Sequence, residues 1–168
     1  MTTVVSHVVG SLRTENGKGI VRMEDSFDTT AVDLWSALTD PHRLSRWLAD
    51  VEGDLRPGGL FHARFTSSWD GPGRLDACEA PHRLLATMSP GSDDETVIEA
   101  VITENQGKTT LVIEERGLPL AEYAAHGAGW QAHVEDLALH LGGQATSIWK
   151  DRWMELVPGY EELSGKLG

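Results

Sequence analysis

The stretch from Gly129 to Gly143 limits the fold of this chain more than any other part of it. At about 100° per residue, its apolar side chains form one stripe, made of Trp130, Val134, Leu137, Ala138 and Leu141. Glu135 falls on the opposite side, and Gly142-Gly143 can end a helix because glycine accepts left-handed backbone. The pattern predicts one long amphipathic helix over about residues 121–141, which needs a concave partner for its apolar side.

The residues before this helix are typical of β-strands separated by turns. The predicted strands cover about residues 4–14, 19–27, 60–65, 74–79, 82–88, 95–104 and 109–115. Asn16-Gly17 indicates a tight hairpin, since both residue types tolerate positive φ. Two short helices are expected after the first strands, over 31–38 and from Pro41 to Leu48. An antiparallel sheet of about six or seven strands covered by one long helix is an α+β fold.

The chain length predicts one domain over residues 1–168, with a core at about 8–143. A C-terminal helical extension over 144–168 should dock on this core through an apolar set, made of Ile148, Trp149, Trp153 and Leu156. Pro158-Gly159 is expected to end that helix.

Charge and composition narrow the functional classes. The net charge is −12 and Lys and Arg are not clustered, which argues against nucleic acid and anionic membrane surfaces as partners. No run approaches the roughly 18 apolar residues of a membrane span, and the N-terminus lacks the pattern of a signal peptide. The single cysteine, Cys78, excludes an internal disulfide and agrees with a cytoplasmic protein.

Four motifs in order resemble the family of activator homologues of the ninety-kilodalton heat-shock-protein ATPase, within the START-like (SRPBCC) superfamily. They are residues 34–41 (LWSALTDP) with Leu44 and Trp47, residues 53–61 (GDLRPGGLF), residues 80–84 (APHRL), and Gly129-Trp130 with His133 and Leu137. The likeness spans roughly residues 8–143, and the tail from Trp149 to Tyr160 looks like extensions seen in this family.

The resemblance implies a helix-grip fold of the START or Bet v type, in which a curved antiparallel sheet wraps around the long C-terminal helix. It also implies a cavity between sheet and helix. The candidate lining residues are Trp35, Trp47, Phe61, Phe65, Met88, Trp130, His133, Val134 and Leu137. For each of them the alternative is ordinary core packing, and for His133 it is a position at the edge of the apolar stripe.

Metal and catalytic sites find little support in the spacing of residues. His126, His133 and His140 rise about 10.5 Å per step along a helix and cannot share one ion. His133 with Asp136, or Asp136 with His140, could pair on a helix surface. We therefore expect no metal ligands.

Two further sets could carry catalysis. Cys78 and His82 could approach one another on adjacent strands, but no third orienting residue can be placed. A strand carboxylate turned into an apolar cavity could act as an acid or base; the candidates are Glu99, Glu104, Glu114 and Glu115. The sequence does not show which of them turns inward, and solvent exposure is the default, so no catalytic residue is assigned.

Three functions follow as hypotheses. The first is a cofactor-free protein that holds a small hydrophobic ligand, lipid-like or aromatic, between sheet and helix. The second is a protein-interaction module or activator of a chaperone ATPase. The third is a polyketide cyclase or hydrolase-like enzyme that uses the same cavity. A binding protein is favoured over an enzyme, and a homodimer and a chaperone partner stay open.

Overall fold

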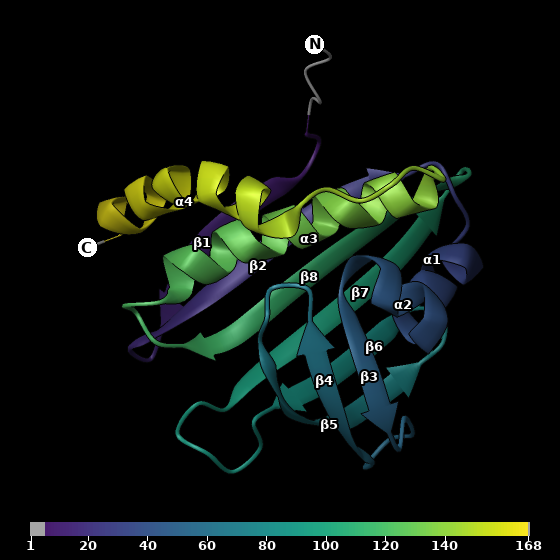
Figure 1. Cartoon of the computed structure of the whole chain (residues 1–168), viewed down its shortest axis with the longest axis horizontal. Helices are drawn as coiled ribbons and strands as arrows, with labels where there is room; N and C mark the ends of the chain where they lie inside the picture. Colours follow the sequence, from purple (N-terminus) through teal and green to yellow (C-terminus); the bar gives the residue numbers. More distant parts are fainter. Residues whose placement is uncertain (1–5, 168) are drawn as a thin grey trace.

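The computed structural model describes residues 6–167, and its strands form a single antiparallel sheet in the order β1-β2-β8-β7-β6-β5-β4-β3. The strands are β1 (Val9–Glu15), β2 (Lys18–Phe27), β3 (Ala49–Gly53), β4 (Leu60–Phe65), β5 (Asp70–Glu79), β6 (Arg83–Met88), β7 (Thr96–Asn105) and β8 (Lys108–Leu118). The sheet is curved, and α3 (Tyr123–Leu141) lies across its concave face (Figure 1). The helix-grip fold expected from the resemblance is therefore present.

Two short helices close one end of the sheet. The helix α1 (Ala31–Thr39) begins at Thr30, whose side chain accepts a hydrogen bond from the Asp33 amide. The helix α2 (Pro41–Trp47) begins with Pro41 directly after its capping residue Asp40. Trp47 at its end is fully buried and donates its indole N–H to the Ala37 carbonyl at 2.9 Å, which fixes the two helices together.

The sheet has one strand more than the sequence predicts. The additional strand is β3, which pairs only with β4 at the edge of the sheet, with Val51 opposite Ala63. Its five residues alternate apolar and charged side chains over too short a run to stand out from the turn that follows. Residues 4 and 5 of the predicted first strand lie outside the described residues.

The long helix is buried on two sides, which corrects the simple amphipathic prediction. Trp130, Val134 and Leu137 are buried against the sheet as expected. Glu135, on the opposite side of the helix from the stripe, is half-buried under α4 (Trp149–Lys166) and accepts two hydrogen bonds from Arg152, at 2.6 and 2.9 Å. Ala138, predicted to be in the apolar stripe, is exposed, whereas Leu141 further along the stripe packs against the core.

The C-terminal helix is longer than predicted. It continues through Pro158 to Lys166, and Ile148, expected in its docking face, is 72% exposed just before its start. Tyr160 lies beyond the proline, is buried, and donates its hydroxyl to Gln131 at 2.7 Å, which holds the second half of the helix on α3. The α4 helix therefore runs alongside α3 on the side away from the sheet (Figure 1). No helix in residues 6–167 is both long and apolar enough to span a membrane.

Candidate functional site

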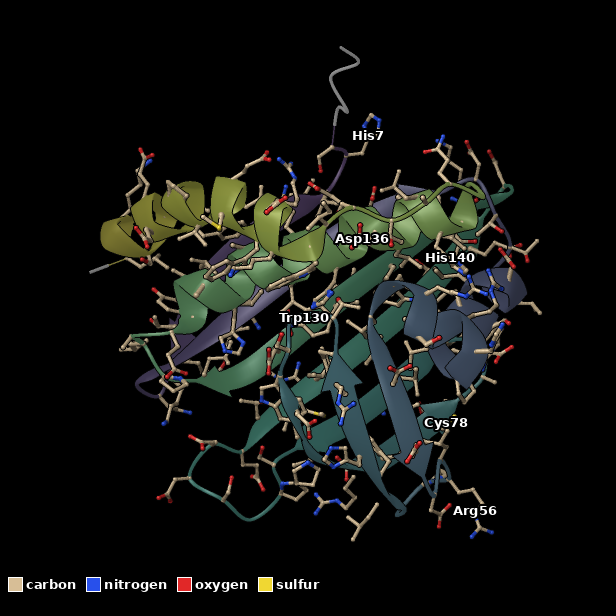
Figure 2. The ribbon with its side chains drawn as sticks, viewed as in Figure 1. His7, Arg56, Cys78, Trp130, Asp136 and His140 are labelled. Carbon is tan, nitrogen blue, oxygen red and sulfur yellow. The ribbon has the colours of Figure 1, made fainter. Side chains whose placement is uncertain are left out.

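A cleft of about 560 Å³ opens between the sheet, the first half of α3 and the start of α4. Its walls carry five aromatic rings, those of Phe65, Trp69, Trp130, Trp149 and Trp153. Figure 2 shows Trp130 beneath α3, between this helix and the sheet. The cleft is thus a site with flat, polarisable walls that suit a planar ligand.

A second, apolar chamber of about 170 Å³ lies between the sheet, α1 and α2. Phe61, Ala63, Ala86, Ala100 and Ile113 are among the side chains that line it. Alanines at three of these wall positions leave space that larger side chains would fill. The chamber shares four wall residues with the cleft, namely Phe65, Met88, Ile98 and Trp130.

The nine candidate lining residues divide between cavity wall and core. Five line the cleft or the chamber: Phe61, Phe65, Met88, Trp130 and His133. Within the described part of the chain, the other four belong to the packed core and to neither cavity wall: Trp35, Trp47, Val134 and Leu137. Trp35 and Trp47 lie on α1 and α2, which contact α3 at the end of the sheet away from the cleft.

His133 is held among aromatic rings in a neutral form. It is 3% exposed, its ring stacks on Trp149 with centroids 5.2 Å apart, and Nδ1 lies 3.4 Å from the Thr66 hydroxyl. Burial lowers the pKa of His133 to about 3, and a hydrogen bond with the Trp47 backbone offsets this only in part. At neutral pH this side chain is therefore an uncharged part of the cleft wall.

Glu115 is the polar centre of the cleft, and sequence reasoning did not single it out from the other carboxylates. It is 6% exposed, and both carboxylate oxygens are engaged. Trp130 Nε1 donates to Oε1 at 2.8 Å, Thr96 Oγ1 donates to Oε2 at 2.8 Å, and His126 Nδ1 lies 3.3 Å from Oε1. These partners come from α3 and β7, so the carboxylate joins the sheet to the helix.

The electrostatics favour a charged pair. Burial raises the pKa of Glu115, but the hydrogen bonds and charge of His126, with those of Trp130 and Thr96, outweigh burial and leave its pKa below the usual value. Burial lowers the pKa of His126, but Glu115 outweighs this effect and raises its pKa above the usual value. A carboxylate and an imidazolium therefore stabilise one another at the cleft wall.

A simple signal in the sequence identifies Glu115 once the strand is known. Leu111 and Ile113 are buried on the concave face, and alternation places Glu115 on that same face. Glu114 points to the other face, where it pairs with Arg13 at 2.9 Å. Glu99 is likewise on the outer face and pairs with Arg83 at 2.6 Å. Glu104 is exposed at the end of β7, so Glu115 is the one buried carboxylate of the four candidates.

The other candidate sets have structural roles or separate surroundings. Asp136 is buried and accepts hydrogen bonds from the Ser147 backbone and hydroxyl, at 2.8 and 2.7 Å, so it pairs with neither helix histidine. Cys78 lines the apolar chamber. His82 is exposed, and its Nδ1 lies 3.3 Å from the Ile102 carbonyl oxygen. No group of three potential metal ligands occurs among residues 6–167.

The cleft is also acidic. Its described lining residues include four carboxylates, those of Asp70, Asp94, Glu115 and Glu122, and no lysine or arginine. Asp70 forms an ion pair with Arg64 at 3.0 Å and a hydrogen bond with His62. A cationic or neutral ligand therefore meets less repulsion there than an anionic one.

Comparisons with known proteins agree with this fold. The model of a family described as activator of Hsp90 ATPase homolog 1-like protein matches residues 28–142. The crystal structure of CalU16 from Micromonospora echinospora is 23% identical, with a TM-score of 0.77 over 94% of this chain and 97% of that one. The conserved protein of unknown function EF2215 from Enterococcus faecalis is 18% identical, with a TM-score of 0.75 over 95% and 92% of the two chains.

DynU16, from the dynemicin biosynthetic locus, is 27% identical, with a TM-score of 0.69 over 76% of this chain and 49% of that one. A comparison with curated protein sequences finds no match.

Proposed function

This chain belongs to the family of activator of Hsp90 ATPase homolog 1-like proteins, and we propose that it binds a hydrophobic, aromatic small molecule between its sheet and α3. The observation that carries the proposal is the unfilled space bordered by Phe61, Phe65 and Trp130. A domain that served only as a protein-interaction module would need no such chamber. The proposal therefore ranks ligand binding above chaperone activation.

Burial of apolar surface alone provides enough free energy for ligand binding, without an ion pair. Burial of apolar surface stabilises a complex by about 25 cal/mol per Å². A two-ring ligand that buries about 200 Å² of its surface gains about 5 kcal/mol before the costs of association. Stacking on the indole ring of Trp69, which lines the cleft, adds to this.

The neighbours suggest a ligand class within this proposal. DynU16 comes from a biosynthetic locus. By that likeness we extend the proposal to a planar product or intermediate of biosynthesis. The aromatic walls of the cleft and its uncharged His133 support such a ligand.

The test is a titration with N-phenyl-1-naphthylamine, a neutral aromatic dye that fluoresces in apolar surroundings. We expect saturable binding to the wild-type protein. Ala86→Phe places a ring in the apolar chamber and should weaken binding at least tenfold, because Ala86 lines that chamber. Val101→Phe adds the same ring on the exposed face of β7 and should leave the affinity unchanged.

Two results would overturn the proposal. One is wild-type protein that shows no saturable binding of the dye. The other is an equal loss of affinity in Ala86→Phe and Val101→Phe while both variants keep the wild-type circular dichroism. Native mass spectrometry of freshly purified protein, which detects a co-purifying small molecule, would identify the natural ligand.

A further inference from the structure

The Glu115–His126 pair is not explained by ligand binding alone. A buried carboxylate is costly unless every oxygen is satisfied, and an apolar residue at position 115 would close the core at lower cost. Instead, three donors from two elements fix the carboxylate at the wall of the cleft. That degree of orientation is what a positioned acid–base group requires.

The orientation of His126 assigns different tasks to its two ring nitrogens. Nδ1 faces Glu115, which accepts a hydrogen bond from it and so selects the tautomer with the proton on Nδ1. Among residues 6–167, no protein group makes a hydrogen bond to Nε2. His126 lines the cleft together with Gly129 and Trp130, so Nε2 is the nitrogen left for a bound molecule.

We propose that His126 is a general base in the cleft, with Glu115 as its positioning residue, and that the substrate is a planar aromatic molecule with an acidic C–H or O–H. The inference rests on the proposed function, since the molecule must first occupy the cleft. The aromatic side chains of the cleft orient the ring system of the substrate, and His126 lines the same cleft.

The step balances without a co-reactant. Nε2 of neutral His126 accepts the proton of the substrate, and the electron pair of the broken bond moves onto an electronegative atom of the same molecule. The imidazolium that forms is stabilised by the Glu115 carboxylate. Return of the proton to another atom of the substrate completes an isomerisation and restores the neutral base.

The groups around His126 make it a stronger base. Glu115 faces it from β8 and Glu122 from the residue before α3, and both favour its protonated form. Asp94, from the loop between β6 and β7, and Asp70, from β5, complete the carboxylates of the cleft. His133 is the other titratable base there, and its burial keeps it neutral.

The test uses 5-nitrobenzisoxazole, a planar aromatic probe whose ring opens when a base removes its C3 proton. The N–O bond breaks in the same step, and the coloured product is 2-cyano-4-nitrophenolate. We expect His126→Gln to lower kcat/KM about 100-fold, the range for loss of a general base. His82→Gln removes an exposed histidine outside the cleft lining and should leave kcat/KM unchanged.

The pH dependence of kcat/KM shows whether Glu115 positions His126 and tunes its pKa or only supports the fold. Wild-type kcat/KM should rise with pH as His126 loses its proton and then level off. Glu115→Gln keeps the shape of the side chain but removes the charge, so the midpoint of this rise should move to lower pH. An unchanged midpoint in Glu115→Gln would contradict the role assigned to that residue.

Failure of this inference can be told apart from failure of ligand binding. If wild-type protein and His126→Gln bind N-phenyl-1-naphthylamine equally but turn over the benzisoxazole at the same rate, the base assignment is wrong and the binding site stands. If the dye does not bind the wild-type protein, the proposed function fails as well.

Discussion

At the scale of single residues, the pKa values of the two histidines that line the cleft shift in opposite directions. His133 is buried without a countercharge, and its pKa falls to about 3. His126 is partly buried beside the Glu115 carboxylate, which raises its pKa. The same helix therefore presents one imidazole that stays neutral and one that readily takes a proton.

His133 should make the folded protein sensitive to acid. Its unfolded pKa of about 6.5 lies above its folded pKa, so its stabilising effect is complete above pH 6.5 and is lost as the pH falls toward 3. His133→Phe removes this titration. Between pH 7 and 4.5, we expect the free energy of unfolding of the wild type to fall more steeply than that of the variant, by about 2–3 kcal/mol.

Urea unfolding at several pH values measures this difference. The opposing linkage of His126, which stabilises the fold below its raised pKa, is common to both proteins and cancels in the comparison. Parallel pH dependence in wild type and His133→Phe would contradict the burial of a neutral imidazole.

The sequence indicated the aromatic character of the site but not its boundary. Trp130, Val134 and Leu137 belong to the same apolar stripe of the helix. Of these three residues, only Trp130 lines the cleft or the chamber. Whether a stripe residue is wall or core depends on how α1 and α2 fill the end of the sheet, and no local pattern encodes that. The inward position of Glu115 could have been predicted, because side chains alternate between the two faces of the sheet along β8.

At the scale of elements, hairpin signals and helical periodicity predicted nearly all strands and the order of the helices. These features depend on neighbours in the chain, as Asn16-Gly17 illustrates with its two positive φ angles. β3 was missed because its alternation covers only five residues, and the second half of α4 depends on a distant partner. Pro158 alone argues for a helix end, but Tyr160 docked on α3 outweighs the lost backbone hydrogen bond.

The close contact of α3 and α4 rests on a missing side chain. A Cβ at Gly127 would lie 2.6 Å from the ring of Tyr160, whereas a Cβ at Gly159 meets nothing within 4 Å. We expect Gly127→Ala to lower the free energy of unfolding by about 1–3 kcal/mol through overpacking. Gly159→Ala should raise it by up to about 1 kcal/mol, because alanine is the better helix former.

Thermal unfolding of the two variants provides the measurement. The pair is matched, since each substitution adds one methyl group to a helix. A stabilised Gly127→Ala would show that α4 does not pack on α3 as described. The result would also bear on the cleft, because Trp149 and Trp153 reach its wall from α4.

At the scale of the whole molecule, the charge of the cleft and that of the surface have the same sign. The chain has a net charge of −12, and the cleft lining described above contains carboxylates without lysine or arginine. The potential of the molecule therefore attracts cations toward a site whose walls are indole rings, and such rings bind cations through their faces.

Three naphthalene probes of one size test this selectivity. At pH 8 and low salt, we expect 2-naphthylmethylammonium to bind about tenfold more tightly than 2-naphthalenemethanol, and 2-naphthoate to bind more weakly than either. Calorimetric titration gives the three affinities. Raising the ionic strength should shrink the spread, because salt screens the acidic groups at the cleft but leaves the apolar contacts unchanged. Tighter binding of the carboxylate than of the ammonium would mean that His126, and not the surrounding carboxylates, sets the charge that a ligand meets.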